Sequence, residues 1–458
     1  MTQLFTVGSC GTALSLIETE RFSDWLEAQS STTKTWVKSS GYEGKGLSLI
    51  PGAEGQLSHV VYGVENLNDH FACGDLVNLL PEGNYRPIAV GETVLKRLAF
   101  SWGIGAYRFT RYNHRQKKAN NNKNLPTLML PSADLKIHIE REVSAVTLIR
   151  DLINTPAQDM MPEHLGATVE CLASQFGGEV HQLVGTELLE HNYPTIHAVG
   201  RASEHAPRLI DLRWGDESHP KITLVGKGVC FDSGGLNIKT TSGIRHMKKD
   251  MAGAANAIGL AQLIMAHQLP VRLRLLVPAV ENAISNNAYH PGDVITTRKG
   301  ISVEINNTDS EGRLVLCDAL TEADRESPDL LIDFATLTGS CRVALGTELP
   351  GFFSNNKARA QDLIRAGEAV DDPLWQLPLY QPYKTELNSD IADMANSGSA
   401  LGGAIIAALY LQEFISPDTD WLHVDFMAWN TRVLPGRPVG GEAVGIRAVF
   451  SYLSQTYV

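Results

Sequence analysis

Short apolar segments alternate with longer segments of helical periodicity through the second half of the chain. Five segments of strand length are rich in Leu, Ile and Val, which predicts strands. They cover residues 208–214, 221–228, 272–280, 330–339 and 421–429. Segments with helical spacing lie between or after them, at residues 251–269, 312–326, 402–415 and 441–455. Apolar strands joined by helices predict a mainly parallel sheet with helices on both faces, and such sheets bind ligands beyond the carboxyl ends of their strands.

A smaller α/β pattern occupies the first part of the chain. Residues 59–64 and 86–91 predict short strands, and residues 91–107 predict a helix that runs into a turn. These elements carry no recognisable catalytic motif. The pattern predicts a small N-terminal α/β domain without chemistry of its own.

The segment 108–126 separates the two patterns. It is basic, then rich in Asn, and it ends at a proline, which predicts a linker because it offers little to bury. Its Arg, Lys and Tyr residues leave a nucleic-acid-binding patch open as an alternative. We predict an N-terminal α/β domain of residues 1–125 that ends in this linker, and a catalytic domain of residues 126–458.

Composition narrows the class of protein. The 458 residues are 43% hydrophobic and 20% charged, and the formal net charge is −12. These values indicate a globular protein of two domains and disfavour nucleic acid as the main partner. The six cysteines are scattered without a C-x-x-C pair, which favours a reducing compartment. Without a basic N-terminal region or an apolar run of about 20 residues, the sequence predicts a cytoplasmic protein with no membrane segment.

Two clusters of charged residues fall where this rule for parallel sheets expects a ligand site, and the first directly follows the predicted strand 221–228. The first is the segment "VGKGVCFDSGGLNIK", in which Lys227, Asp232 and Lys239 stand among four glycines. Glycine lets a backbone turn sharply and approach a ligand closely. Asp250 follows at the start of the Ala-rich helix. A carboxylate in a first helical turn is also favoured by the helix dipole, so Asp250 alone has a purely structural interpretation.

The second cluster is the segment "NNTDSEGRLVLCDAL", where Asp309, Glu311 and Arg313 occupy alternate positions. In an extended segment these side chains would face the same way, just before the helix led by Leu314. The structural alternative is an ion pair between Arg313 and one of the acids. That ion pair would leave one of the two carboxylates, Asp309 or Glu311, without a partner. It also does not explain the acids of the first cluster.

A site for divalent cations accounts for all four acids. Carboxylate oxygens suit Mg, Mn or Zn, and bridging carboxylates suit two ions about 3.5–4 Å apart. The sequence has no H-E-x-x-H, no G-x-S-x-G and no phosphate-binding loop of the G-x-x-x-x-G-K type. The "DSGG" segment also occurs around the nucleophile of trypsin-like proteases, but their all-β fold does not match this pattern. The residues therefore favour a two-metal hydrolase.

The motifs resemble those of a known family. "NNTDSEGRL" resembles the N-T-D-A-E-G-R-L signature of the leucyl (cytosol) aminopeptidase family, peptidase family M17. "VGKGVCFDSGGLNIK", "MKKDMAGAA" and "IDFATLTGSC" resemble the other blocks of that family, in the same order. The resemblance covers roughly Asn154 to the C-terminus. The chain departs from the family at Ser310, which replaces Ala, and at Lys248, Lys249 and Ala252, where Arg, Ala and Gly are usual.

The resemblance implies a role for each charged residue. The site would hold two divalent ions, which could be Zn, Mn or Mg. Their ligands would be Lys227, Asp232, Asp250, Asp309 and Glu311. Asp232 and Glu311 would contact both ions, Asp309 one, and Lys227 with Asp250 the other. Lys239 would stabilise the developing oxyanion, and Arg313 would hold a bicarbonate ion that acts as the general base toward a metal-activated water.

The resemblance also implies a pocket for the side chain of the first substrate residue. Met247, Thr336 and Gly339 match family positions that line this pocket. The segment "HVDFMAWN" would supply the rest of the wall, ending at Asn430. Family members have smaller or more apolar residues there, so the preferred N-terminal residue stays open.

The implied activity is the removal of the N-terminal residue from peptides with a free N-terminus. The implied assembly is a homohexamer. A dipeptidase of the Cys-Gly type, a DNA-binding regulator and a catalytically inactive paralogue are the alternatives. All seven expected ligands and catalytic residues are present, which disfavours the inactive paralogue.

Overall fold

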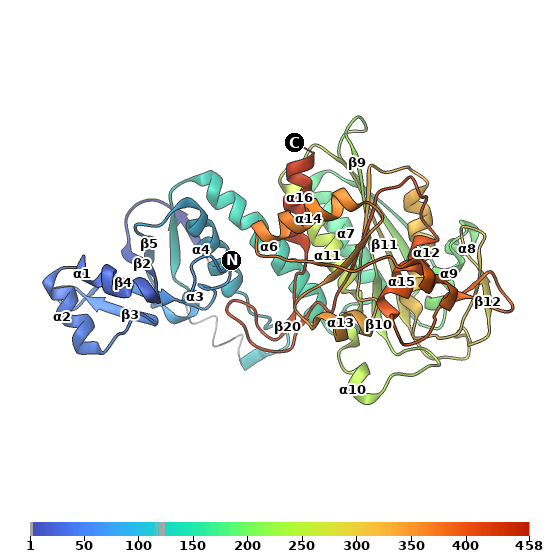
Figure 1. Ribbon diagram of the computed structural model, residues 1–458, viewed down its shortest axis with the longest axis horizontal. Helices are drawn as coiled ribbons and strands as arrows, with labels where there is room; N and C mark the ends of the chain where they lie inside the picture. The colour runs from blue at the N-terminus through green and yellow to red at the C-terminus, as the bar shows by residue number, and fades with distance from the viewer. Residues whose placement is uncertain (1–2, 116–117, 119–123, 458) are drawn as a thin grey trace. The chain divides into compact units, whose positions relative to one another are not determined.

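The computed structural model describes residues 3–115, 118 and 124–457, which fall into two compact units (Figure 1). The first comprises Met1–Thr147 and Arg432–Val439, and the second comprises Leu148–Thr431 and Gly440–Val458. The division lies within helix α6 (Ala133–Asn154) and differs from the predicted boundary at 125/126. The prediction relied on the change in composition at residues 108–126, which marks an interruption of regular structure. The division between the two units depends instead on contacts between residues far apart in the sequence. Of the predicted linker, residues 116–117 and 119–123 lie outside the described residues.

The first unit contains a six-stranded sheet in the order β1-β6-β5-β2-β4-β3. Every neighbouring pair is parallel except β3 with β4. The strands are β1 (Phe5–Val7), β2 (Thr12–Glu18), β3 (Gly46–Pro51), β4 (Leu57–Val64), β5 (Asn84–Pro87) and β6 (Thr127–Leu130). The helices of this unit before α6 include α1 (Phe22–Glu27), α2 (Ser31–Ser40), α3 (Leu76–Leu79) and α4 (Glu92–Gly105). The predicted α/β character of this region is confirmed.

The second unit is built on a nine-stranded sheet in the order β16-β15-β18-β14-β9-β11-β8-β7, with β10 also paired to β11. The four central strands, β18, β14, β9 and β11, are parallel, and antiparallel pairs occur toward both edges. The strands are β7 (Glu179–Val184), β8 (Arg208–Trp214), β9 (Lys221–Gly226), β10 (Gly228–Asp232), β11 (Arg272–Asn282), β14 (Leu330–Ala335), β15 (Gly351–Ser354), β16 (Trp375–Gln376) and β18 (Trp421–Asp425). The mainly parallel sheet is confirmed.

Helices cover both faces of this sheet (Figure 1). On one side α11 packs on β9 and β14 and is itself covered by α7 and α16, with α14 against α16. On the other side α12 packs on β11 and contacts α9 and α15. These helices are α7 (Pro162–Phe176), α9 (Pro194–Gly200), α11 (Ala252–Ala266), α12 (Glu311–Asp324), α14 (Lys357–Ala369), α15 (Gly403–Gln412) and α16 (Ile446–Thr456). Nearly every residue of α11 is buried, as expected for a helix that is apolar on all sides.

Shorter elements complete the second unit. They are α8 (Glu187–Glu190), α10 (Thr241–Ile244), α13 (Gly339–Leu345), β12 (Val294–Thr296), β13 (Ser302–Glu304), β17 (Met394–Ala395), β19 (Trp429–Asn430) and β20 (Gly440–Gly441). Short 3-10 helices cover Thr19–Arg21, Ala157–Asp159, Met247–Met251 and Gln381–Leu387. The third of these, η3, leads directly into α11.

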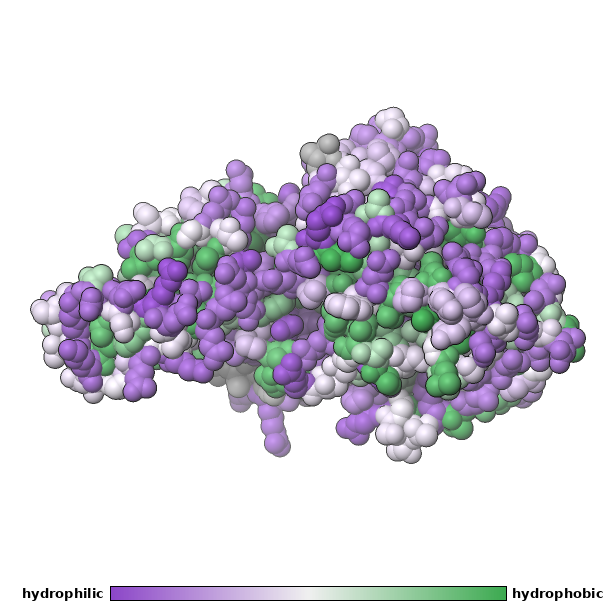
Figure 2. Space-filling model, viewed as in Figure 1, coloured by the Kyte–Doolittle hydropathy of each residue, from purple (hydrophilic) through white to green (hydrophobic). Residues whose placement is uncertain are grey.

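The surface is mixed in polarity. Hydrophilic residues cover much of the face in Figure 2, with hydrophobic residues in small groups between them. All six cysteines are free, and four of them are buried. Within the described ranges, no helix combines the length and apolar character that a membrane crossing needs.

Candidate metal centre and active site

A cavity of about 460 Å³ opens where the central strands of the second unit end. Lys227 follows β9 directly, Asp232 is the last residue of β10, and Thr336 follows β14. Figure 1 shows β10, α10 and α13 at the same edge of this unit. This is the carboxyl edge of the parallel strands, where the sequence predicted a ligand site.

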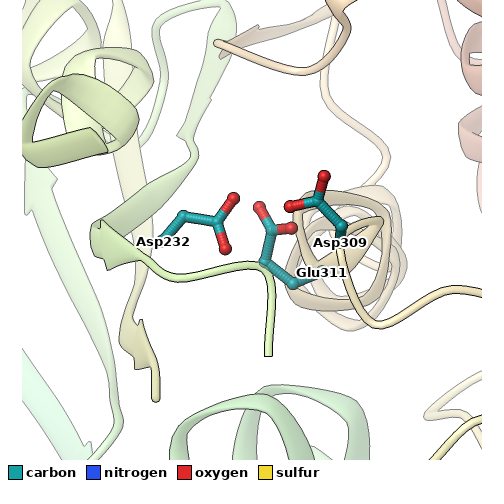
Figure 3. A group of neighbouring side chains, drawn as sticks. All are labelled: Asp232, Asp309 and Glu311. Carbon is teal, nitrogen blue, oxygen red and sulfur yellow. The ribbon is translucent and has the colours of Figure 1, made fainter. Parts of the chain in front are cut away.

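Three carboxylates converge in this cavity (Figure 3). Asp232, Asp309 and Glu311 each present an oxygen within 4.8 Å of the others. Asp309 lies in a turn, and Glu311 is the first residue of α12. The predicted extended geometry, with the helix led by Leu314, is therefore wrong. The acids converge because a turn delivers Asp309 and the helix start delivers Glu311; an acid is favoured there by the helix dipole.

Lys227 and Asp250 form the buried end of the cluster. The Lys227 ammonium lies 2.7 Å from Asp250 Oδ2 and 2.8 Å from Glu311 Oε1, and it donates a hydrogen bond to the Thr336 carbonyl at 3.1 Å. Asp250 belongs to η3, so its carboxylate is aimed from the turn that precedes α11. The hydroxyl of Thr336 donates to its Oδ1 at 2.8 Å.

Lys239 lies at the more open end of the cluster. Its ammonium is 2.8 Å from Asp232 Oδ2 and also pairs with Asp309. The other oxygen of Asp232 accepts two hydrogen bonds at 2.8 Å, from the Asn282 amide and from the backbone N–H of Gly234. Gly234 has φ +88°, so the turn that returns its N–H to Asp232 favours glycine.

Gly312 allows Lys227 to cross the start of α12. A Cβ at this position would lie 2.8 Å from Lys227 Cε and 2.9 Å from its Nζ. No side chain fits without moving the lysine away from Glu311. The glycine of the "SEGRL" segment is therefore required by close packing against a metal-ligand candidate.

The cluster carries more negative charge than its lysines balance. Burial and the neighbouring Asp232 raise the pKa of Glu311 to about 7. Burial also raises the pKa of Asp232 and of Asp309, with Asp250 and Glu311 respectively adding to it. Burial alone would lower the pKa of Lys227, but Asp250 and Glu311 raise it. Among the described residues, Asp250 Oδ2 and Asp309 Oδ1 each have an ammonium group as their only close polar partner, from Lys227 and Lys239 respectively.

This donor set fits divalent cations. It offers four carboxylates with unused oxygen lone pairs and one amine in a buried, concave site. Hard oxygen donors suit Mg, Mn and Zn. Like-charged carboxylates this close together need cations to balance them, since uncompensated buried charge is costly.

Arg313 does not join the cluster. Its guanidinium donates to the Asn396 carbonyl at 2.7 Å. In the described part of the chain, it forms no ion pair with Asp309 or Glu311, so the structural ion pair considered from the sequence is absent. The side chain leaves the acids because Glu311 and Arg313 are both helical and point in different directions around α12.

Three of the four predicted pocket residues line the cavity, namely Met247, Thr336 and Gly339. The structure does not place Asn430 on the cavity wall. Its amide is buried and donates to Glu442 Oε2 at 2.7 Å, and that carboxylate also pairs with Arg150. Asn430 turns toward the protein interior because its amide binds the buried Glu442 carboxylate. Sequence periodicity alone does not reveal such a partner.

Several residues that position the site were missed. Asn282 binds Asp232, and Asn396 accepts from Arg313. The buried carboxylate of Asp425 accepts the backbone N–H groups of Leu337 and Thr338, which fixes the turn after β14. Asn282 and Asp425 are the last residues of the apolar strands β11 and β18. A polar residue at the carboxyl end of a parallel strand could have identified both from the sequence.

Two cations on the cavity wall were also missed as pocket residues. They are Lys249, buried in η3, and Arg342, exposed on α13. Burial lowers the pKa of Lys249, and Asp250 opposes that effect. The sequence showed that Lys249 departs from the family pattern. It did not show that the Lys249 side chain lines the cavity.

Comparison with known proteins agrees with these features. Residues 147–450 match the model of the cytosol aminopeptidase family, catalytic domain, and residues 12–126 match that of the M17 aminopeptidase N-terminal domain. A probable cytosol aminopeptidase from Syntrophotalea carbinolica is 41% identical over 365 residues, which cover 77% of this chain and 73% of the relative.

Solved structures agree as well. The crystal structure of a cytosol aminopeptidase from Coxiella burnetii has a TM-score of 0.95 at 47% identity and covers 100% of both chains. The bottromycin maturation enzyme BotP in complex with Mn has a TM-score of 0.86 at 28% identity, covering 98% of this chain and 100% of that one. These similarities extend over both predicted parts of the chain.

Proposed function

The chain belongs to the cytosol aminopeptidase family and is a leucyl aminopeptidase-type hydrolase, and we propose that it releases N-terminal residues from peptides with two divalent metal ions and bicarbonate. The observation that carries this proposal is the convergence of Asp232, Asp309 and Glu311 at the carboxyl edge of a parallel sheet. Asp309 and Glu311 match the family signature and Asp232 matches another block of the family, and their separation suits shared cations.

The ligands in this proposal are five residues of the cluster, namely Lys227, Asp232, Asp250, Asp309 and Glu311. Asp232 and Glu311 would contact both ions, Asp309 one, and Lys227 with Asp250 the other. Lys227 would bind as a neutral amine, a form that its burial and nearby cations favour. The oxygen-rich donor set suits Zn, Mn or Mg, and the Mn complex of BotP supports a divalent metal.

Lys239 supports the reaction at the open side of the cluster. Bound divalent ions would polarise the scissile carbonyl and acidify the attacking water. The Lys239 ammonium lies beside Asp232 and Asp309, so it would face the charge that develops on the carbonyl oxygen and would stabilise it there. The side of the site formed by Lys227 and Asp250 would take the α-amine of the substrate, which confines cleavage to the N-terminal residue.

Arg313 would hold the bicarbonate ion that serves as the general base. Support comes from its lack of an ion pair with either neighbouring acid in the described residues. One nitrogen is fixed on the Asn396 carbonyl, which orients the planar group. The remaining N–H groups can bind an oxyanion in two-point fashion.

The experiment that tests this function measures hydrolysis of L-leucine p-nitroanilide by metal-free and reconstituted protein. We expect turnover to disappear after chelation and to return with Mn²⁺ or Zn²⁺. The same preparation should be tested on a panel of other amino-acid anilides and on dipeptides such as Cys-Gly. A folded, metal-loaded protein that cleaves none of them would overturn the proposal.

Assembly and location are part of the same proposal. The family resemblance implies a homohexamer and a cytoplasmic enzyme. Mass photometry at nanomolar concentration tests the first, with a mass of six chains expected. Fractionation of the source cells tests the second.

A further inference from the structure

The cavity wall holds two positive charges that have no close carboxylate partner among the described residues. Lys249 has a side chain that is only 7% exposed, yet its Nζ makes no hydrogen bond among the described residues. Its one ion pair there is a long one, 3.9 Å to Asp250 Oδ1, and Asp250 already pairs with Lys227 at 2.7 Å. An ammonium buried without a close anion is costly unless something else supplies one.

Arg342 adds a second unpaired cation at the same place. It lies on α13, lines the cavity, and makes no ion pair or side-chain hydrogen bond within the described residues. Its Nη2 lies 3.8 Å from the position that a Cβ on Gly339 would occupy. It is also close enough to Lys249 for the two charges to repel each other.

Both cations adjoin the residues assigned to the first substrate side chain. Lys249 shares η3 with Met247, and Arg342 adjoins Gly339. The cavity is lined by four acids, namely Asp232, Asp250, Asp309 and Glu311, and by four bases, namely Lys227, Lys239, Lys249 and Arg342. Cations bound to the acids would leave this lining with a surplus of positive charge.

We propose that Lys249 and Arg342 make this side-chain pocket selective for an acidic first residue, so that the enzyme prefers peptides beginning with Glu or Asp. This inference rests on the proposed function. The carboxylate of such a substrate supplies the anion that the buried Lys249 lacks. Apolar wall residues, Met247 and Met427, contact the methylene part of the same side chain.

The test compares kcat/KM for the p-nitroanilides of L-glutamate and L-glutamine. These substrates have the same shape and differ in the charge of the side chain. Neither has a C-terminal carboxylate, so a preference cannot arise from binding that end of a peptide. We expect glutamate to be favoured at least tenfold, because a charged hydrogen bond in a desolvated site contributes roughly 1.5–3 kcal/mol.

Lys249→Met should reduce the glutamate-to-glutamine ratio by about 10- to 100-fold. Any loss of metal affects both substrates equally, so the ratio isolates selectivity. Arg342→Gln should reduce it only severalfold, and less at high salt, because Arg342 is exposed. Lys248→Met is the matched control: its Nζ donates to the Asn154 carbonyl and lies over the Trp429 ring, away from the cavity lining. That variant should keep the wild-type ratio.

The outcomes separate this inference from the proposed function. Protein that cleaves leucine anilide but favours glutamine, or keeps its ratio in both the Lys249 and Arg342 variants, overturns the acidic pocket alone. Metal-loaded protein that cleaves no anilide overturns both. If Lys249→Met does not fold, the wild-type ratio and Arg342→Gln still decide the matter.

Discussion

Helix α12 has a glutamate near each end, and the two lie in opposite electrostatic surroundings. Glu311, at the start, stands among other carboxylates, and burial with the Asp232 charge raises its pKa to about 7. Glu322, near the end, contacts Arg274 at 3.0 Å and also pairs with Arg298. Burial would raise the pKa of Glu322, but these arginines lower it.

The difference distinguishes a functional cluster from a structural one. Arg274 also binds Asp211 at 2.7 Å and Glu326 at 3.2 Å, so the cluster around Glu322 is balanced by its own residues. The four acids around Glu311 have only Lys227 and Lys239 as close cationic partners among the described residues, and we propose that metal ions complete the balance. Buried charge alone does not indicate a site; buried charge that the chain leaves unbalanced does.

The largest expected effect is the loss of activity on substitution of Glu311, at the start of α12. Glu311→Gln should lower kcat/KM for leucine anilide by about a thousandfold, because a shared metal ligand supports several kcal/mol of transition-state stabilisation. Metal content per chain, measured by plasma mass spectrometry, should fall with it. The free energy of unfolding of the metal-free protein should not fall, since one member of a crowded acidic cluster is neutralised.

Arg313→Met is the control for this variant. It should lose rate while it keeps the metal, because within the described residues Arg313 pairs with Asn396 and with no member of the acidic cluster. Wild-type metal content in Glu311→Gln would contradict the ligand assignment. A destabilised metal-free Glu311→Gln would contradict the contrast between the two ends of α12.

A substitution at Glu322, the balanced end of α12, should change the free energy of unfolding and not the activity. Glu322→Gln should lower the free energy of unfolding by about 2 kcal/mol, because Arg274 and Arg298 lose a partly buried partner. Activity per folded molecule should stay at the wild-type value. Urea unfolding of the metal-free protein measures the change. Glu217→Gln is the matched control, since Glu217 is 87% exposed and its contact with Arg272 should contribute almost nothing.

The smallest expected effect is the pH dependence of the stability difference between the wild type and Glu322→Gln. Because folding lowers the pKa of Glu322, its stabilising contribution is present above the unfolded glutamate pKa of about 4.3 and is lost as the pH falls through the lower folded value. The stability gap between wild type and Glu322→Gln should therefore shrink by about 1 kcal/mol between pH 6 and pH 3.5. Paired urea titrations at the two pH values measure it. A gap that widens on acidification would contradict the assigned direction.

Local patterns were sufficient to predict most of the central sheet. The apolar segment 208–214 coincides with β8, and residues 221–228 contain β9, because buried parallel strands need continuous apolar residues. The strand β7 was missed, since "EVHQLV" is half polar and lies at the sheet edge. The last helix begins at Ile446, after Gly445 with φ +74°, and not at 441, because Gly440 and Gly441 pair with β19.

The site was predictable in its acids but not in all of its geometry. The four carboxylates of the two charged clusters indicated cations, and the family motifs assigned their individual roles as ligands. The orientations of Arg313 and Asn430 depend on Asn396 and Glu442, which lie 83 and 12 residues away along the chain. Such partners meet only after folding, so no local pattern contains them.

The spacing of the proposed ligands along the chain has a consequence for synthesis in the cell. Lys227 and Glu311 are brought together only when α12 has docked beside the end of β9. A ribosome-bound chain that ends before Asp309 lacks part of the centre whatever metal is present. With the proposed ligand set, hydrolytic activity requires that the chain has been synthesised at least through Glu311 and has folded.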